Sequence, residues 1–321
     1  MNNTSGIQSS ERHYSLEPKI AWYWSARLII SAFAILGNGV VICLIATKKR
    51  LQIICNWFVL SLAVSDFCVG LLLTPTGLVC SYLFPCDWRL QLAFYNFLLF
   101  ASTLNLWAMM YDRHHAIVYP LTYLTQMTTR KITVIISLPW STSGLVSFIR
   151  LLWFYDNTPR KEIESYYRVF VDLFFGLFSC LLLVIIFVRI LMIVFRHSRS
   201  AASQAAHLSF NQTFRVEYKY KRERLSAKIL GAVLCLFVVC YSLSIYISFC
   251  LNFKLCSPSP QLRLASILLI HLNCAINCLV YALLKKDFRT ELRKLLRCDS
   301  ELNIAAKVEG VGLNIFNHTS R

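Results

Sequence analysis

The sequence predicts an all-α membrane protein, in which seven helices cross the bilayer and a short amphipathic helix follows the seventh. Of the 321 residues, 57% are hydrophobic and only 15% are charged, with a mean hydropathy of +0.55. This composition is too apolar for an ordinary soluble domain. Apolar segments long enough to span a hydrocarbon core of roughly 30 Å occur seven times. Buried helices of a large soluble bundle would carry polar faces and caps, which these segments mostly lack.

The seven segments are bounded by charged or turn residues. They lie at Ala21–Ala46, Asn56–Leu83, Leu90–Tyr111, Ile132–Phe154, Val169–Phe195, Ile229–Asn252 and Leu262–Leu284. The stretch RVEYKYKRERLSAKIL is charged yet compatible with a helix, so we expect the sixth helix to extend into the cytoplasm. The stretch KKDFRTELRKLLRC predicts an amphipathic helix on the inner membrane surface. Its apolar face consists of Phe288, Leu292, Leu295 and Leu296.

One membrane domain is the simplest organisation, because no internal repeat or linker divides the chain. We expect an extracellular segment at 1–20, the seven-helix domain at 21–284, and the amphipathic helix with a cytoplasmic tail at 285–321. Lys and Arg concentrate in alternate connections and in the tail, which places the N-terminus outside. The net charge of +17 therefore indicates topology and attraction to the anionic lipid bilayer. Nucleic acid is not an expected partner, because no soluble module carries a basic face with interleaved aromatics.

Two kinds of covalent modification follow from this topology. Asn2 and Asn3 both begin N-x-[ST] sequons on the outer side and predict glycosylation. Cys298 ends the amphipathic helix on the inner side and predicts palmitoylation. Most of the 13 cysteines lie in apolar segments, where a small buried hydrophobe is the usual role.

An acid within a membrane helix needs a partner, water or an ion, and Asp66 in the second segment is such a residue. Polar residues at comparable depth are Asn38, Ser102, Asn105, Asn273 and Asn277. One carboxylate with hydroxyl and amide oxygens suits a small hard cation. The alternative is a hydrogen-bonded polar cluster that joins the helices. Spacing alone leaves both interpretations open.

The stretch WAMMYDRHHAIVYP places Asp112 and Arg113 where the third helix meets the cytoplasm. Arg113 can pair with Asp112 and with an acid on another helix, for which Glu223 is the obvious candidate. Such a bridge between helix ends could act as a latch whose release opens a cytoplasmic cleft. The alternative is an arginine that only extends toward lipid headgroups.

The ordered motifs resemble those of class A (rhodopsin-like) G-protein-coupled receptors from about Gly37 to Cys298. These motifs are GNGV, LAVSD, STLNLWAMMYDRHHAIVYPLTY, Trp140, KRERLSAKILGAVLCLFVVCY and NCLVY followed by KKDF. The stretch DRHHAIVYPLTY is most similar to the corresponding sequence in receptors of the amine and trace-amine branch. The resemblance implies a multi-pass plasma-membrane receptor that binds a small extracellular ligand and activates a heterotrimeric G protein by opening a cytoplasmic cleft.

The same resemblance assigns roles to individual residues. Arg113 becomes the G-protein-facing switch, restrained by Asp112 and Glu223 in the inactive state. Tyr281 would swing toward Arg113 on activation, and Phe237 would belong to the helix-packing switch. A sodium ion is the one cofactor that the family pattern suggests. Its pocket would consist of Asp66, Ser102, Asn273 and Asn277, supported by Asn38.

Several positions depart from the family pattern. Ser179, Leu243 and Cys278 stand where the fifth, sixth and seventh helices carry prolines. Because activation rearranges the bends that such prolines cause, we expect altered signalling strength. The first position of the usual outer disulfide is Trp88, and the loop between the fourth and fifth helices has no cysteine. Cys86, two residues earlier, can pair with Cys80 or Cys256 or stay free.

The pocket also departs from the amine pattern. Tyr95, flanked by Asn96, stands where amine receptors carry an acid on the third helix. The resemblance to some trace-amine receptors moves the anchor to the fifth helix, where Asp172 lies. Tyr95, Tyr241 and the deeper Phe237 would supply aromatic surface for an ammonium ligand. Asn96 and His271 complete the expected ligand-binding residues. Alternatively, Asp172 is an interfacial acid that faces Arg168 or His271.

Other functional classes are less consistent with the sequence. His271 replaces the retinal-binding lysine of light-sensing members, so no Schiff base can form there. A transporter would show broken half-helices and an internal repeat. An enzyme would gather a nucleophile, base and orienting group on one side of the bundle. A non-signalling, receptor-like scaffold remains the principal alternative, because the prolines and the usual disulfide are missing.

Overall fold

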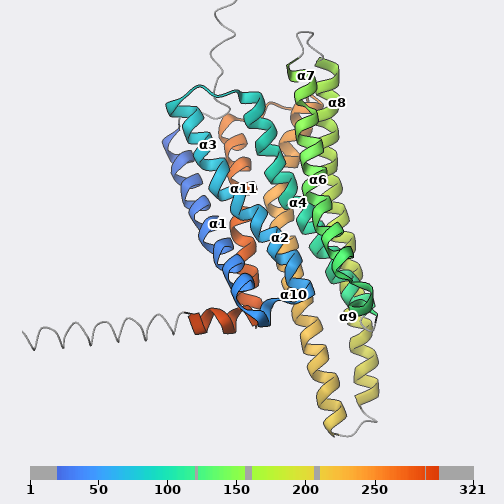
Figure 1. Cartoon of the computed structure of the whole chain (residues 1–321). Coiled ribbons are helices and arrows are strands. Elements are labelled where there is room, and N and C mark those ends of the chain that lie inside the picture. Colours follow the sequence, from blue (N-terminus) through green and yellow to red (C-terminus); the bar gives the residue numbers. More distant parts are fainter. Residues whose placement is uncertain (1–19, 120–121, 156–160, 206–209, 286, 296–321) are drawn as a thin grey trace, which may run out of the picture.

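The computed structural model describes residues 20–119, 122–155, 161–205, 210–285 and 287–295. Within these residues, seven helices are long and apolar enough to cross a membrane, and no strand occurs. The helices stand side by side in a single bundle (Figure 1). This arrangement confirms the predicted seven-helix fold. The end of the bundle that the charge pattern places outside is called the outer end.

The seven spans agree closely with the predicted segments. In chain order they are α1 (Ala21–Thr47); α2 (Ile54–Cys68) through η3 (Val79–Leu83); α4 (Trp88–Val118); α6 (Thr129–Ile149) with α7 (Leu151–Phe154); α8 (Lys161–Val171) through α9 (Ser179–Ala205); α10 (Phe210–Asn252); and α11 (Pro260–Leu284). Two short helices, η1 (Lys49–Leu51) and α5 (Tyr123–Gln126), lie in inner connections. A helix over 287–295 follows the seventh span.

Two spans contain wider, π-helical turns. In the second span, η2 (Val69–Leu73) and η3 flank α3 (Thr74–Leu78), whose first turn contains Pro75. In the fifth span, η4 (Asp172–Phe178) comes directly before Ser179. The Ser179 hydroxyl donates to the carbonyl oxygen of Phe174 at 2.9 Å. The fifth span therefore changes its helical geometry at the missing proline, and such π-turns often occur at functional sites.

The sixth and seventh spans are continuous helices. α10 runs for 43 residues through Leu243, and α11 has its only proline, Pro260, at its first position. α10 continues below the level of the other inner helix ends except α9 (Figure 1). This length confirms the predicted extension of the sixth helix. Helix α11 also passes through Cys278 without interruption, because a cysteine retains the backbone N–H that a proline lacks.

The first and seventh spans approach closely at Gly37. A Cβ atom at this glycine would lie 2.1 Å from the Sγ atom of Cys278. The glycine of the GNGV motif is therefore required by packing. Farther in, the main apolar core joins several spans through buried side chains such as Phe58, Met109 and Phe237.

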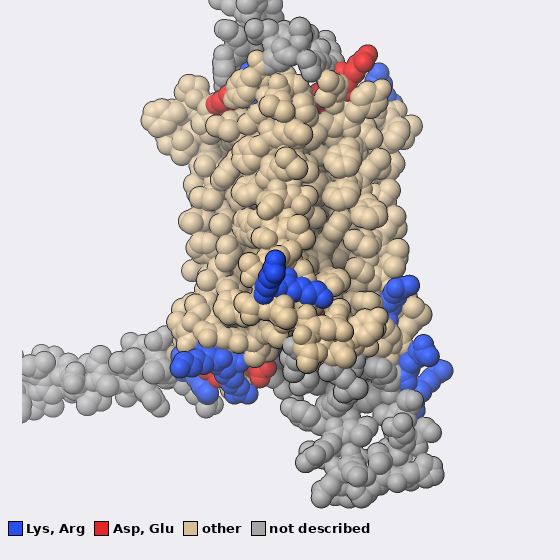
Figure 2. All heavy atoms as spheres, turned by 45° about the vertical axis from the view of Figure 1, so that its right-hand side comes forward, with Lys and Arg blue, Asp and Glu red and all other residues tan. Residues whose placement is uncertain are grey.

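The surface has the pattern expected of a protein that spans a membrane. Figure 2 shows a face whose middle lacks charged side chains, with a few charged residues of both signs at its upper end and Lys and Arg gathered toward its lower end. The 287–295 helix lies across this end of the bundle (Figure 1). Its Phe288 is only 1% exposed and belongs to the main core, so this member of the predicted apolar face packs against the bundle. Arg50 ties the helix to the bundle through Asp287 at 3.3 Å.

Disulfides and aromatic contacts shape the outer end. Cys86 pairs with Cys80, and Cys256 pairs with Cys250, so each disulfide closes a short local loop. The tie between the third and fourth spans is noncovalent. The rings of Trp88 and Phe154 lie 5.3 Å apart, and the Tyr155 hydroxyl donates to the Asp87 carboxylate. We call these four residues the outer clamp.

Candidate functional site

A cavity of about 190 Å³ lies among the third, fifth, sixth and seventh spans. Ligand pockets in proteins typically measure roughly 300–1,000 Å³, so this cavity suits a compact ligand. Its polar wall consists of Asn96, Thr103, Asp172, Tyr241, Ser244 and Ser248. Apolar and aromatic side chains complete the wall, including Phe100 and Phe175, whose rings stack at 3.8 Å.

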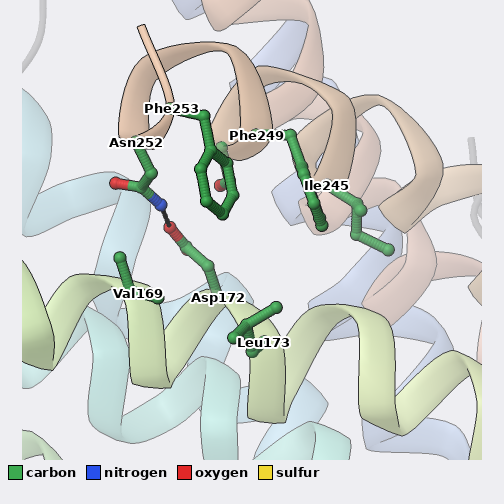
Figure 3. Close-up of a pocket in the computed structure, with 8 residues that line it drawn as sticks. Val169, Asp172, Leu173, Ile245, Phe249, Asn252 and Phe253 are labelled. Carbon is green, nitrogen blue, oxygen red and sulfur yellow. Dashed lines mark hydrogen bonds between the residues drawn. The ribbon is translucent and has the colours of Figure 1, made fainter.

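Asp172 lies in the outer half of the fifth span, at the first position of η4. Its carboxylate lines both this cavity and a narrow crevice between the fifth and sixth spans. The Oδ2 atom accepts a hydrogen bond from the Asn252 amide at 2.8 Å (Figure 3). Among the described residues, no Lys or Arg forms an ion pair with Asp172, and Arg168 lies 3.7 Å from Glu164 instead. Asp172 therefore makes no direct ion pair with Arg168 and, within the described part of the chain, no hydrogen bond with His271. Arg168 and Arg150 nevertheless lie close enough to attract its charge, and the Ser248 side chain is a further hydrogen-bond partner.

The third span contributes Tyr95 and Asn96 to the cavity. His271 does not line it, which differs from the expectation. Its ring lies 5.5 Å from that of Tyr95, and its Nδ1 lies 2.8 Å from the carbonyl oxygen of Ile267. The position is fully packed, because only 2% of His271 is exposed.

Arg27 is a buried cation near this wall that the sequence reasoning missed. Its guanidinium donates to the Tyr23 hydroxyl at 2.9 Å and to the carbonyl oxygen of Leu73 at 3.1 Å. It also lies 5.7 Å from the centre of the Tyr95 ring. The sequence did contain a signal for Arg27. An ionisable residue inside an apolar segment is unusual, and this holds for Arg27 as it does for Asp66.

The floor of the cavity is aromatic. Tyr241 stands where the family usually has tryptophan, and its hydroxyl lies 3.1 Å from that of Thr103. Phe237 lies below and stacks on Tyr241, with ring centres 4.2 Å apart. Phe237 is fully buried in the main core and does not line the cavity. Its position between the cavity and the inner core agrees with the expected depth.

Asp66 is fully buried and joins three spans. Its Oδ1 atom accepts from the Ser102 hydroxyl at 2.5 Å, and its Oδ2 atom accepts from the Asn277 amide at 2.9 Å. Asn38 lies nearby but donates to the carbonyl oxygens of Ala34 and Cys274 instead. Spacing alone could not show which of the polar residues at this depth contact the acid.

The polar residues expected around Asp66 offer oxygen atoms that are suitable ligands for a small hard cation. The Oδ1 atoms of Asn273 and Asn277 are buried and accept no hydrogen bond from any described residue. Two amide oxygens, a hydroxyl and a carboxylate are ligands of the kind that such cations prefer. Cys274 also lies here, with its Sγ 3.7 Å from the Ser102 hydroxyl, but a thiol is a poor ligand for this class of ion. Asn105 is directed elsewhere, because its Oδ1 accepts from Ser61 at 2.7 Å.

At the inner end, Asp112 is fully buried and has two partners. Arg113 lies 2.5 Å from its Oδ2 atom, and the Tyr123 hydroxyl donates to its Oδ1 atom at 2.5 Å. Tyr123 comes from α5, so the inner loop after the third span helps to hold the pair. Burial and the neighbouring Asp112 carboxylate raise the pKa of Tyr123, which keeps its hydroxyl a donor.

Lys285 lies beside this pair, at the end of the seventh span. Its ammonium donates to the Asn56 side chain and lies 5.3 Å from the centre of the Phe288 ring. Burial, together with the nearby Arg113 charge, lowers the pKa of Lys285 to about 7. The sequence indicates only that Lys285 belongs to the basic tail. A charge pattern does not show that the Lys285 side chain is buried.

Some predicted residues lie outside what the structure describes. Asn2, Asn3, Leu296 and Cys298 fall in undescribed segments. The backbone of Glu223 lies in α10 and that of Tyr281 in α11, but neither side chain is among those described. The interaction of Arg113 with Glu223 or Tyr281 therefore stays a prediction.

The fold and these sites define a seven-transmembrane receptor. The family described as 7 transmembrane receptor (rhodopsin family) matches residues 37–281, and the chain belongs to it. The protein is accordingly a multi-pass plasma-membrane receptor of the kind that signals through a G protein, and not an enzyme.

Several named receptors are similar to the chain over most of its length. The octopamine receptor beta-2R of Chilo suppressalis is 24% identical, with 84% of this chain and 78% of the relative aligned. The human histamine H2 receptor is 28% identical over the same shares. The human adenosine receptor A2a is also 28% identical, with 86% of this chain and 72% of the relative aligned. Amine receptors are thus among the relatives, together with a receptor for a nucleoside.

Proposed function

We propose that this receptor binds a small cationic amine from outside and activates a heterotrimeric G protein by opening its cytoplasmic end. The observation that carries the proposal is Asp172. It is a half-buried carboxylate on a cavity wall, it accepts from a neutral amide, and no described cation pairs with it. A carboxylate in such surroundings favours a cationic partner, since burial without one is costly.

The rest of the cavity supports the same ligand class. The volume of about 190 Å³ accommodates a compact molecule. Tyr95, Tyr241 and the stacked Phe100–Phe175 pair offer aromatic faces, which attract an ammonium ion and pack against a ring. Asn96 and Ser244 can bind polar substituents. The names of the octopamine and histamine receptors agree with an amine ligand, although this chain holds its acid on the fifth span.

Two further parts of the proposal concern the inner half. Asp66, Ser102, Asn273 and Asn277 bind a sodium ion that favours the inactive conformation. Asp112 holds Arg113 until activation, when Arg113 turns toward the G protein and Tyr281. The support is the oxygen donor set around Asp66 and the direct Asp112–Arg113 contact.

The experiment measures G-protein activation in cells that express the wild-type chain or Asp172→Ala. The cells are challenged with phenethylamine, tyramine, tryptamine, octopamine and histamine. We expect at least one amine to activate the wild type and the response to fall at least about tenfold in potency in the variant. A hydrogen bond to a charged group contributes roughly 1.5–3 kcal/mol, which corresponds to this change.

A matched control is Glu162→Ala, which removes an exposed outer acid that does not line the cavity. With surface expression verified, it should leave the amine response unchanged. No amine response in the wild type would contradict the ligand class. Absence of any G-protein activation, with or without ligand, would favour a non-signalling scaffold, for which the unbroken α10 and α11 are the supporting observation.

A further inference from the structure

We propose that Asn252 acts as an internal substitute for the ligand, holding the Asp172 carboxylate until a cationic ligand displaces its amide and releases the outer end of the sixth span. This inference rests on the proposed function, because it concerns regulation of the same cavity. It assigns a role to the last residue of α10, which lies outside every motif in the sequence.

The geometry places Asn252 in competition with a ligand. Asp172 belongs to both the cavity and the crevice, and Asn252 lines only the crevice. The Asn252 amide donates to the Oδ2 atom at 2.8 Å, so the carboxylate is directed toward the sixth span (Figure 3). A ligand in the cavity must approach the same carboxylate from the other side.

The chemistry favours displacement. In the pair with Asn252 only the acceptor is charged, whereas an ammonium ligand would add a charged donor. Hydrogen bonds between two ionised groups are shorter and stronger than those with a neutral partner, especially in a site of low dielectric constant. The Asn252 side chain is near the end of its helix and half-exposed, so its amide can turn to water after release.

The surrounding contacts make this bond a control point between two spans. One turn farther in, the fifth and sixth spans already touch: a Cβ atom at Gly176 would lie 3.1 Å from the Cγ1 atom of Ile245. This close contact can serve as a pivot, and the Asp172–Asn252 bond closes the gap on its outer side. Loss of the bond would allow the outer end of α10 to tilt about the pivot.

The continuous sixth span can carry such a tilt inward. α10 has 43 residues and no proline, which makes it roughly 64 Å long at about 1.5 Å per residue. In a helix with a proline kink, much of an outer movement could be absorbed at the bend. Here both ends belong to one rigid helix, so a tilt at Asn252 moves the inner end in the opposite direction. The missing proline is then part of the mechanism.

The test compares Asn252→Leu and Asn252→Ala with the wild type in full-length receptor at the cell surface. Leucine keeps the side-chain volume, and both substitutions remove the donor. We expect basal nucleotide exchange to rise at least about threefold. We also expect the half-maximal concentration of phenethylamine, or of the most potent amine in the panel, to fall about tenfold, because the ligand no longer competes with the amide.

Leu251→Ala is the matched control, because Leu251 is exposed and lines neither the cavity nor the crevice. The Asn252→Leu effect should vanish in an Asp172→Ala background, since the two residues act through one bond. Wild-type basal exchange and wild-type potency in both Asn252 variants would overturn the proposal. Raised basal exchange without any amine response would support the restraint and reject only the ligand class.

Discussion

Asp66 and Asp172 lie in different spans, and their partners explain their different roles. Both oxygens of Asp66 accept hydrogen bonds from other spans, and the amide oxygen of its partner Asn277 is buried without a hydrogen bond from any described residue. Asp172 lies at the cavity wall, accepts from the Asn252 amide at the end of a helix and is also a hydrogen-bond partner of the Ser248 side chain. The first environment suits a small ion held inside the bundle, whereas the second suits a ligand that enters from outside.

Asp66→Asn should abolish any effect of sodium on amine affinity, because the substitution removes the only negative charge of the proposed ion site. The measurement is displacement of a bound amine in membranes at constant ionic strength, with sodium exchanged for a large organic cation. Asn38→Ala is a useful comparison, because Asn38 donates to backbone oxygens and not to Asp66. A sodium effect that persists in Asp66→Asn would reject this site.

Lys285→Gln should change how receptor stability depends on pH. Burial lowers the pKa of Lys285 from 10.5 to about 7, so the folded state binds fewer protons than the unfolded state between these values. The free energy of unfolding of the wild type therefore gains a contribution as pH rises from about 7 toward 10.5. Below pH 7 the destabilisation from the buried charge is fully present. Glutamine removes the titration and keeps a donor for Asn56.

The measurement is the thermal unfolding midpoint in nanodiscs at pH 6 and pH 9. Relative to the wild type, Lys285→Gln should be more stable at pH 6 than at pH 9. Lys294→Gln serves as the control, because Lys294 is exposed and pairs with Glu291. An identical pH dependence in wild type and Lys285→Gln would show that Lys285 does not titrate in this range.

Candidate site residues could be predicted from the sequence where a charged side chain interrupts an apolar segment. Asp66, Arg113 and Asp172 were found in this way, and Arg27 could have been. Partners were harder to predict, because neutral side chains such as Asn252 and Tyr123 carry no signal until the fold brings them to an acid. His271 is expected among the ligand-binding residues, but it packs against Tyr95 and is not among the residues that line the cavity.

At the scale of elements, the outer clamp occupies the place of the usual disulfide between the third span and the following loop. Asp87 also caps α4, because its Oδ1 atom accepts from the backbone N–H of Arg89 at 2.9 Å. The hydrogen bond from Tyr155 lowers the pKa of the Asp87 carboxyl, so the contact persists at neutral pH. Unlike a covalent bond, this tie does not depend on redox conditions.

Trp88→Ala should lower the thermal unfolding midpoint of the receptor more than Tyr155→Phe does. The first substitution removes an aromatic packing partner of Phe154, whereas the second removes one exposed hydrogen bond. The midpoint is measured in nanodiscs with and without a reducing agent. Tyr166→Phe is the control, because Tyr166 is 75% exposed. A midpoint in Trp88→Ala equal to that of the wild type would contradict the clamp.

Element positions followed from the sequence because length and hydropathy determine where a helix can cross the bilayer. The geometry within a span did not follow. The π-turn at η4 arises without a proline, and hydropathy has no signal for a single wider turn. The packing of Phe288 against the bundle was not predictable, because periodicity identifies an apolar face but not whether lipid or protein covers it.

At the scale of the whole molecule, the receptor joins an outer cavity to an inner Asp112–Arg113 pair through long, continuous helices. Among the spans that line the cavity, the fifth changes its helical geometry, whereas the sixth and seventh continue as α-helix through the usual proline positions. Activation should therefore resemble the tilting of whole helices about a contact such as Gly176–Ile245.

Glu223→Ala should raise basal nucleotide exchange severalfold if Glu223 and Asp112 share the restraint of Arg113. The position of Glu223 in the inner part of α10 is the motivation, and its side-chain contacts are a prediction from the sequence. The assay is ligand-free exchange on a set of heterotrimeric G proteins. Glu301→Ala, in the tail, is the control. Basal exchange equal to that of the wild type would count against the interhelical restraint.

The most direct test of the central claim is binding of amines to the purified receptor in nanodiscs, measured for wild type and Asp172→Asn. Phenethylamine and the other panel amines are compared with 2-phenylethanol, which has a neutral hydroxyl in place of the ammonium. We predict that at least one amine binds the wild type, that it binds Asp172→Asn at least about tenfold more weakly, and that the alcohol does not distinguish the two proteins. Equal amine affinity for both proteins would contradict the assignment of Asp172 as the ligand anchor.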